Sequence, residues 1–533
     1  MTTSPPLETP IIIGICDIKN KHSATDLAAA KEPLTLIHDA VLGAINDASL
    51  GASEGAHAAL KSGIDSVDVV RTWTWPYEDL PGALAEKLKD SEGDEGDRVK
   101  WKAYSEHGGD KPGVLLDMAA RRLARGECKI AVVCGGEALA SLSAYAKAEQ
   151  LPPPGWTTPA EAVEAVFSPT TRTLGVKNLG AIHKVGAPIH VYPMYENAFR
   201  AQRGQSPKEN HEESAELYAE FSKIASKNEY AWNYGKYDDA ETIGTISKSN
   251  RLICSPYPLL MNAFNAVNLA SALLLTTASH ARSLSIPCSK WIYPLGGAGT
   301  SDAPNFWTRP SFHTSPALSR SLTSALDISH TPIQDIDLLD IYSCFPIVPK
   351  LAAHHLGLPI IRGEKSLTLL GGLTSFGGAG NNYSMHALTG MTRALREGKG
   401  KKGLVLCNGG MMTYQFAIVL GTDGRVGGGY TDHNPLEELG YDEVDVAEGI
   451  DAEGDVIIET YTVEFHRNAS PLRGHIVARL KKNGKRVLAN HADEHTLRAL
   501  ASSGSEVVGR EGRVVHDAKT GRGLFSFKEV AAL

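Results

Sequence analysis

One unit occurs twice in this chain, far apart, and constrains the fold more than any other feature. In each copy an amphipathic helix ends at a glycine, which tolerates the left-handed angles of a helix C-terminus. The strand that follows has no polar residue before its cysteine, as is typical of a strand buried on both faces. The two copies are RRLARG at 121–126 with IAVVCGG at 130–136, and RALREG at 393–398 with LVLCNGG at 404–410. This duplication predicts an α/β fold of two similar halves, with Cys134 and Cys407 at equivalent strand ends and the functional site between the halves.

Composition excludes several classes of protein. The chain has 533 residues, 42% of them hydrophobic, and a net charge of −8, so we expect more than one domain with a large core and no nucleic-acid partner. Seven single cysteines without a CxxC pair indicate a reducing, cytoplasmic location and no zinc ribbon or other metal site. The polar, proline-rich start is not a signal peptide. The apolar stretch 259–278 contains Asn262, Asn265 and Asn268, which favours a buried helix over a membrane span.

Changes of pattern along the chain suggest three domains. Strands and helices alternate from Ile11 to about residue 140, and again from about 286 to 421. Residues 141–251 lose this rhythm and are rich in polar and aromatic side chains, so we interpret them as an insertion over the site. We therefore expect a first half at 1–285, a second half at 286–425 and an additional domain at 430–533.

The last hundred residues have the pattern of a small β domain. The segment 456–465 is rich in β-branched and aromatic residues, and the segments 475–480 and 486–489 flank Asn483-Gly484, a strong hairpin signal. We expect a β-barrel of the OB type.

Four motifs, in this order and spacing, resemble the thiolase superfamily over residues 11–421. They are VVCGGE at 132–137, His190 followed by YENA at 195–198, YSCF at 342–345 and CNGG at 407–410. The resemblance implies two βαβαβαββ halves packed as a five-layered αβαβα sandwich, with a loop domain inserted in the first half.

Two catalytic groups of that family are missing. A thiolase carries its nucleophilic cysteine at a helix N-terminus, which lowers the thiol pKa, but the corresponding position here falls near Gly109. The activating histidine of the family's Gly-His-Pro motif is replaced by Gly378. Together with the extra β domain, these changes resemble a cysteine-less branch, the thiolase-like proteins of type 1 with an additional C-terminal domain. The ordinary acyl-enzyme cannot form at this position.

Four side chains are candidates for catalysis. Cys407 matches the thiolase cysteine that acts as acid and base. Its ordinary pKa would suit that role if local charge lowered it slightly, and a buried structural cysteine is the alternative. Tyr342 stands where thiolases have a polar group that helps to hold the thioester oxygen, and it resembles the proton-transfer tyrosine of thiolase-like steroid side-chain aldolases. A packed aromatic with a satisfied hydroxyl is the alternative. His386, on the helix after Asn381, and His190, in the insertion, can each point to the site or lie in the core.

A glycine-rich turn offers backbone donors. Its N–H groups at a helix start suit an oxyanion or a pantetheine amide, and plain turn chemistry is the alternative. The candidate binding residues are Gly377, Gly378, Gly380, Asn381 and Asn382, together with Gly409, whose motif match implies an oxyanion-hole N–H.

The resemblance implies acyl transfer or carbon–carbon bond chemistry on an acyl-CoA or carrier-bound thioester, through an enolate-like intermediate. The alternatives are a retro-aldolase with a tyrosine acid/base and a non-catalytic acyl-CoA-binding or scaffold protein. We expect no permanently bound cofactor, with the coenzyme A thioester as substrate. We expect no membrane partner, a monomer or homodimer, and a C-terminal domain that shields one face or holds a partner protein.

Overall fold

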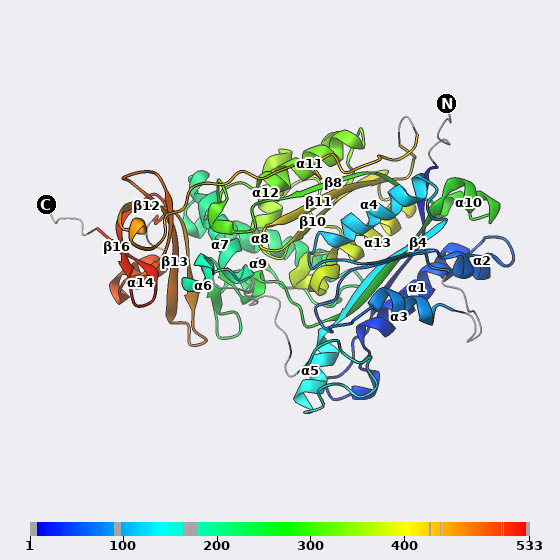
Figure 1. Ribbon diagram of the computed structural model, residues 1–533, viewed down its shortest axis with the longest axis horizontal. Helices are drawn as coiled ribbons and strands as arrows, with labels where there is room; N and C mark the ends of the chain where they lie inside the picture. Colours follow the sequence, from blue (N-terminus) through cyan, green and yellow to red (C-terminus); the bar gives the residue numbers. More distant parts are fainter. Residues whose placement is uncertain are drawn as a thin grey trace.

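The computed structural model describes residues 8–89, 98–163, 166, 178–425, 428–437, 439–502, 504 and 506–528. The molecule is elongated, with two α/β halves at one end and the C-terminal β domain at the other (Figure 1). The acidic stretch 90–97, which the sequence suggests is a solvated loop, lies outside the described residues.

The first half is built on a five-stranded sheet of order β1-β7-β4-β2-β3. β1 pairs with β7 and β7 with β4 in antiparallel fashion, whereas β4, β2 and β3 are parallel. The bounds are β1 (Pro10–Lys19), β2 (Ser66–Val69), β3 (Trp101–Tyr104), β4 (Ile130–Ala138) and β7 (Asn268–Thr277).

The second half repeats this arrangement. Its sheet has the order β8-β11-β10-β9, with β8, β11 and β10 antiparallel and β10 and β9 parallel. The bounds are β8 (Tyr293–Ser301), β9 (Leu338–Ile341), β10 (Lys402–Gly409) and β11 (Tyr414–Gly421). β4 and β10 hold the same place in the two sheets, so the duplicated fold predicted from the repeat is confirmed.

The two cysteines of the repeat are displaced by one residue. The Val70 N–H donates to the carbonyl of Cys134, whereas the equivalent N–H of Tyr342 donates to the carbonyl of Leu406, the residue before Cys407. Successive side chains on a strand point to opposite faces. Cys134 accordingly packs in the outer core and Cys407 in the central one. The strands are equivalent, as expected, but the cysteines are not.

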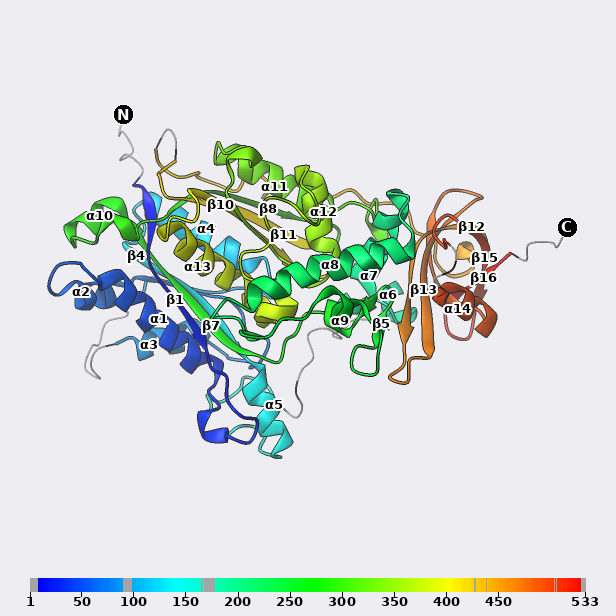
Figure 2. The same cartoon turned by 180° about the vertical axis from the view of Figure 1, so that it is seen from behind.

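Helices complete a five-layered sandwich. α4 and α13 each contact both sheets and form the middle layer, α1, α2 and α3 belong to the outer layer of the first half, and α11 and α12 lie on the second half (Figures 1 and 2). The bounds are α1 (Pro33–Ser49), α2 (Ala56–Gly63), α3 (Leu80–Lys87), α4 (Lys111–Ala124), α10 (Ala278–Ser283), α11 (Pro316–Ile328), α12 (Ile347–Leu356) and α13 (Tyr383–Arg396).

The expected buried helix at 259–278 is wrong. The structure has a short 3₁₀ turn, η2 (Leu259–Met261), followed by the strand β7. β7 lies between β1 and β4 and every one of its residues is buried. A strand covered on both faces has no alternation of polar residues, so its sequence does not differ from that of a buried helix.

The inserted segment is mainly helical. Its elements are α5 (Leu139–Lys147), α6 (Leu179–Ile182), α7 (Pro188–Gln202), α8 (Pro207–Ala225), α9 (Ala240–Gly244), β5 (Leu252–Cys254) and β6 (Tyr257–Pro258). Its first helix, α5, lies beside the first half, whereas α7 and α8 pack beside the second half (Figure 2). The fully buried Lys350 on α12 links the second half to the insertion. Its Nζ lies 2.6 Å from an oxygen of Glu196 on α7 and 2.9 Å from Oδ1 of Asn210 on α8.

The C-terminal domain is a closed five-stranded barrel. Its strand order is β12-β13-β14-β16-β15 and back to β12, with β14 and β16 parallel and a helix between β14 and β15, which is the OB arrangement. The bounds are β12 (Gly454–Phe465), β13 (Pro471–Leu480), β14 (Arg486–His491), α14 (Glu494–Ala501), β15 (Glu511–Asp517) and β16 (Arg522–Phe527).

This barrel is joined to the rest of the chain by buried contacts. The sheet continues from β12 into β5 of the insertion, where Glu464 is opposite Cys254. The fully buried guanidinium of Arg486 donates to the carbonyls of Trp307 and Arg309, and Asn197 on α7 donates to the Tyr461 carbonyl at 3.0 Å.

Candidate functional site

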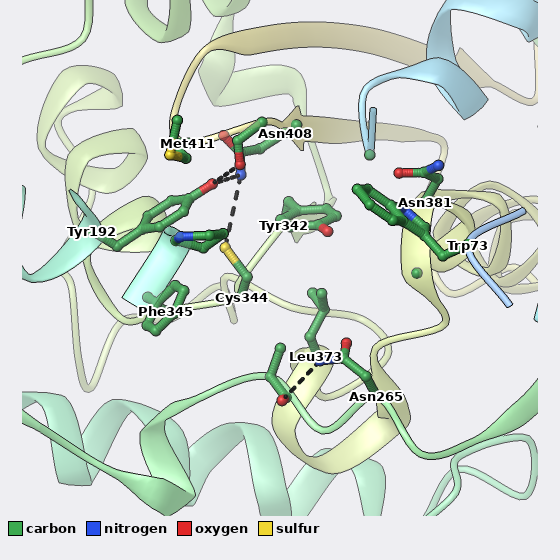
Figure 3. A pocket seen from close by; sticks show the side chains of 16 residues that line it. Trp73, Tyr192, Asn265, Tyr342, Cys344, Phe345, Leu373, Asn381, Asn408 and Met411 are labelled. Atoms are coloured by element: carbon green, nitrogen blue, oxygen red, sulfur yellow. Dashed lines mark hydrogen bonds between the residues drawn. The ribbon is translucent and has the colours of Figure 1, made fainter. Parts of the chain in front are cut away.

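A pocket opens between the two halves, as the strand topology predicts. It has about 720 Å³ of empty space, including its open mouth. Tyr342 lies at its centre, with Trp73 and Asn381 on one side and Tyr192 and Cys344 on the other (Figure 3). The remaining lining residues are Gly109, Pro188, Ala263, Asn265, Phe345, Leu373, Gly380, Asn408, Gly409, Gly410 and Met411.

The Tyr342 hydroxyl faces this pocket without a partner. Tyr342 follows β9 directly, so the strand end positions its ring, which packs edge-on against Tyr383 with centroids 5.5 Å apart. No hydrogen bond joins its hydroxyl to any of the other lining residues drawn in Figure 3. Burial, with Cys344 as a second cause, raises the pKa of Tyr342 well above its ordinary value. At neutral pH this phenol is therefore a hydrogen-bond donor, not a base.

There is no room for the missing nucleophile. Gly109 stands just before α4, and a Cβ built on it would overlap the Asn408 carbonyl oxygen and lie 2.9 Å from Tyr342 Oη. At Gly378, which holds the place of the family's histidine, a Cβ would lie 2.7 Å from Asn265 Oδ1, the end of a side chain that can turn away. The packing therefore excludes a side chain at Gly109 but not at Gly378.

Cys407 does not line the pocket. Its side chain is fully buried, and a Cβ on Gly113 of α4 would lie 3.0 Å from its Sγ. Burial raises its pKa to about 12, and a hydrogen bond from Ser384 opposes this only in part. The acid/base role required a lowered pKa, so the geometry favours the alternative of a structural cysteine.

His386 belongs to a different cluster. Its Nδ1 lies 2.7 Å from an oxygen of Asp17 on β1, and Arg393 holds the other oxygen at 2.6 Å. Burial alone would raise the Asp17 pKa, but the bond from His386 and the charge of Arg393 outweigh it and lower that pKa. Asp17, His386 and Arg393 line a second, polar pocket instead of the one around Tyr342.

His190 is also outside the pocket, although its neighbours Pro188 and Tyr192 line it. It is the third residue of α7 and packs against His475 of the barrel, with ring centroids 4.7 Å apart. Burial, followed by the charge of His475, lowers the pKa of His190 to about 3, so its ring is neutral.

The glycine-rich turn is tightly hydrogen-bonded. It runs through a π-helical turn, η6 (Leu373–Gly377), and a 3₁₀ turn, η7 (Gly380–Asn382). The N–H of Gly378 donates to the Phe264 carbonyl at 2.7 Å, and the N–H of Gly380 to the Gly378 carbonyl at 2.8 Å. These two amides are therefore already used. Gly377 and Gly378 are not lining residues, whereas Gly380 is.

The two asparagines of this turn are structural links. Asn381 lines the pocket, but its Nδ2 donates to the Arg71 carbonyl at 2.8 Å and its Oδ1 accepts the Gly108 N–H at 3.1 Å. Asn382 is buried outside the pocket and donates to the Gly135 carbonyl at 3.0 Å. Gly409 lines the pocket beside Gly410, at the end of β10.

Several residues that line the pocket were not among the candidates chosen from the sequence. Tyr192 and Asn408 form a hydrogen-bonded pair at 2.9 Å, and Gln415 holds the Asn408 Oδ1 at 2.7 Å. Burial raises the pKa of Cys344, at the pocket wall, to about 12. The motifs YSCF and CNGG contain Cys344 and Asn408, so the signal was present, whereas Tyr192 comes from the insertion and carries no such signal.

Glu137 lies behind Trp73, a lining residue, and holds its backbone in place. Its oxygens accept the N–H groups of Trp73 at 2.7 Å and Thr74 at 2.9 Å, and also the Thr74 hydroxyl. Burial raises the Glu137 pKa to about 7 despite these bonds. A Cβ on Gly380 would lie 2.7 Å from the Trp73 ring, so Glu137, Trp73 and the glycine turn are in close contact.

Comparisons with known proteins agree with this architecture. Residues 438–519 match the family model of the thiolase-like protein type 1 additional C-terminal domain. The structure is similar, with a TM-score of 0.77 and 26% identity, to a monomeric SCP2-thiolase like protein type 1 from Mycobacterium smegmatis, over 97% of this chain and 99% of that one. No curated protein sequence matches the chain.

Two further structures are similar over 78% of this chain and 98% of their own. They are an Ltp2-ChsH2(DUF35) aldolase, with 19% identity and a TM-score of 0.54, and the dimeric peroxisomal thiolase of Saccharomyces cerevisiae, with 14% and 0.53. No helix in the described segments is long and apolar enough to cross a membrane. The chain has the thiolase fold, and it ends in the additional C-terminal domain of the thiolase-like proteins of type 1, whose branch it was expected to resemble.

Proposed function

We propose that this protein binds an acyl thioester, of CoA or of a carrier, in the pocket around Tyr342. There it stabilises the negative charge that develops on the thioester oxygen in a reaction that makes or breaks a carbon–carbon bond without an acyl-enzyme. One observation carries the proposal: an unpartnered tyrosine hydroxyl occupies the place next to Gly109 where the resemblance puts the nucleophile.

The chemistry of the pocket suits a donor role for Tyr342. A preorganised donor stabilises charge best where little water competes with it, and this pocket is lined mainly by apolar and amide groups. Because its pKa is raised, Tyr342 keeps its proton at neutral pH and can donate it to an enolate oxygen. The Gly409 N–H remains our proposed second donor.

The charge of the pocket argues against base-initiated chemistry. No Asp, Glu, His, Lys or Arg is found among the described lining residues, and burial raises the pKa of the three ionisable ones, Tyr192, Tyr342 and Cys344. This observation favours a second candidate function, a protein that binds an acyl thioester and does not transform it. It also limits the retro-aldolase alternative, because Tyr342 is poorly suited to accept a proton.

The direct test is mass spectrometry of the protein with a panel of acyl-CoAs, scoring covalent adducts, free products and equilibrium binding. We expect binding, no adduct and negligible thiolysis of acetoacetyl-CoA. Tyr342→Phe keeps the ring and removes the donor, so turnover of a productive substrate should fall about a hundredfold or more. Tyr414→Phe, at an exposed tyrosine, is the matched control and should keep full turnover.

The outcomes separate the candidates. Binding without any product supports the non-catalytic alternative. A covalent acyl adduct, or turnover that Tyr342→Phe leaves unchanged, contradicts the proposed mechanism. Failure of every acyl-CoA and acyl-carrier thioester to bind contradicts both candidates. We further propose that the protein acts as a monomer, as the Mycobacterium smegmatis relative does.

A further inference from the structure

We propose that His190, Glu464 and His475 bind a divalent transition-metal ion of the zinc type, and that this ion fastens the C-terminal barrel to the inserted segment. Within the described residues, these three form the only cluster of His, Cys, Asp or Glu side chains close enough to hold an ion, with their ligand atoms within 4.8 Å of one another. The proposal is independent of the proposed activity, because none of the three lines the pocket.

Three elements bring the ligands together. His190 is in the first turn of α7, which packs on β12. Glu464 lies near the end of β12, and His475 on β13 is paired with Thr462, two residues before Glu464. Residues two apart on a strand share a face, so Glu464 and His475 are diagonal neighbours on the surface that α7 covers.

The distances suit a metal ion better than a hydrogen-bonded trio. Each histidine Nε2 lies 3.8 Å from Glu464 Oε2, too far for a hydrogen bond. Ligand atoms around tetrahedral zinc are about 3.4 Å apart, since Zn–N and Zn–O bonds are about 2.0–2.1 Å. A contraction of a few tenths of an ångström would complete such a site, and the partly exposed Glu464 leaves access for a water molecule as the fourth ligand.

Both histidines present a buried, unpartnered Nε2 to the cluster. His190 and His475 are 7% and 1% exposed, and neither Nε2 has a hydrogen-bond partner. Each Nδ1 accepts one long contact of 3.4 Å, from the Ala187 N–H in His190 and from the Asn490 amide N–H in His475, so metal binding at Nε2 would move the proton to Nδ1 and give up both contacts.

A positively charged side chain, Arg473, already lies near the Glu464 carboxylate. Arg473 Nη1 lies 3.7 Å from the same oxygen of Glu464. Its side chain is partly exposed and can turn toward solvent when the metal binds. Because Arg473 competes with the ion, its removal should strengthen metal binding, a result that a purely structural histidine cluster would not give.

The test is zinc titration of chelator-treated full-length protein by calorimetry, with cobalt(II) as a spectroscopic substitute. We expect one equivalent bound by the wild type and a rise in Tm of a few degrees at saturating zinc. Glu464→Gln and His475→Asn should each weaken binding at least tenfold. Arg473→Gln should strengthen it several-fold. His495→Asn, at an exposed histidine of the same domain, should match the wild type.

Failure of the wild type to bind zinc stoichiometrically would overturn the proposal. So would equal binding by Glu464→Gln and the wild type, which would assign the zinc to surface histidines. Glu464 is partly exposed, so its variant remains a valid test even where His475→Asn fails to fold. The ligand-field absorption of bound cobalt should disappear in Glu464→Gln and persist in His495→Asn.

Discussion

Glu137 should make the stability of this protein depend on pH in a way that one substitution removes. Its carboxyl is buried beneath the pocket wall, where it accepts N–H groups of Trp73 and Thr74 and has no cation beside it. Burial raises its pKa from an ordinary 4.5 to about 7. The folded state therefore holds this proton more tightly than the unfolded chain does.

The magnitude follows from these two values. At about 1.4 kcal/mol for each pH unit, a pKa of about 7 against 4.5 corresponds to about 3 kcal/mol. A raised folded-state pKa gives a contribution that is fully present below pH 4.5 and is lost as pH rises through 7. Most of the change falls between pH 5 and pH 8.

The assay compares free energies of unfolding by urea for the wild type and Glu137→Gln across this range. Because glutamine does not titrate, the wild-type value minus the variant value should fall by about 2–3 kcal/mol from pH 5 to pH 8. Glu78→Gln, at an exposed carboxyl nearby in the sequence, is the control and should run parallel to the wild type. A parallel profile for Glu137→Gln would refute the reasoning.

Three other variants test the packing. Lys350→Met leaves a buried carboxylate without its cation and should cost about 3–5 kcal/mol of unfolding free energy, whereas Lys208→Met, in an exposed ion pair, should cost less than about 0.5 kcal/mol. Gly109→Ala should lower Tm clearly, because its Cβ overlaps a carbonyl oxygen, and Gly440→Ala, in open space, should not. Deleting residues 430–533 should give an aggregating protein, since Arg486 and β12 have buried partners outside the barrel; a soluble, folded deletion variant would contradict this.

Much of the fold could be predicted because the repeat and the hairpin signal are local. The two helix–glycine–strand units fixed the pairing of halves, and Asn483-Gly484 located the β13–β14 hairpin of the barrel. The prediction that failed was the equivalence of the two cysteines, because it depends on which face of the strand each side chain occupies. A shift of one residue between the two copies puts Cys407 on the central face and Cys134 on the outer one, and no sequence pattern in a fully buried strand reveals that difference.

The candidate site was harder, because its members come from distant segments. Tyr342, Gly380, Asn381 and Gly409 do meet in one pocket. His386 and His190 do not, since a helix start or a match of spacing does not determine which face a side chain occupies. The His190, Glu464 and His475 cluster could not be predicted either. Its outermost members are 285 residues apart, and no ligand-spacing motif connects them.

The structure shows different surroundings at the two positions that the thiolase resemblance assigns to the nucleophile and its base. A Cβ at Gly109 would overlap the backbone carbonyl oxygen of Asn408, which cannot move aside cheaply, whereas a Cβ at Gly378 would overlap only the end of the Asn265 side chain. A cysteine cannot be placed at Gly109 without moving the backbone around Asn408, so restoring a histidine at Gly378 alone would not give a thiolase. Burial raises the pKa of Tyr342, which makes its hydroxyl a poor nucleophile, and in our proposal it stabilises charge on a substrate oxygen instead of carrying the acyl group. The chemistry that we propose therefore begins from an intact thioester.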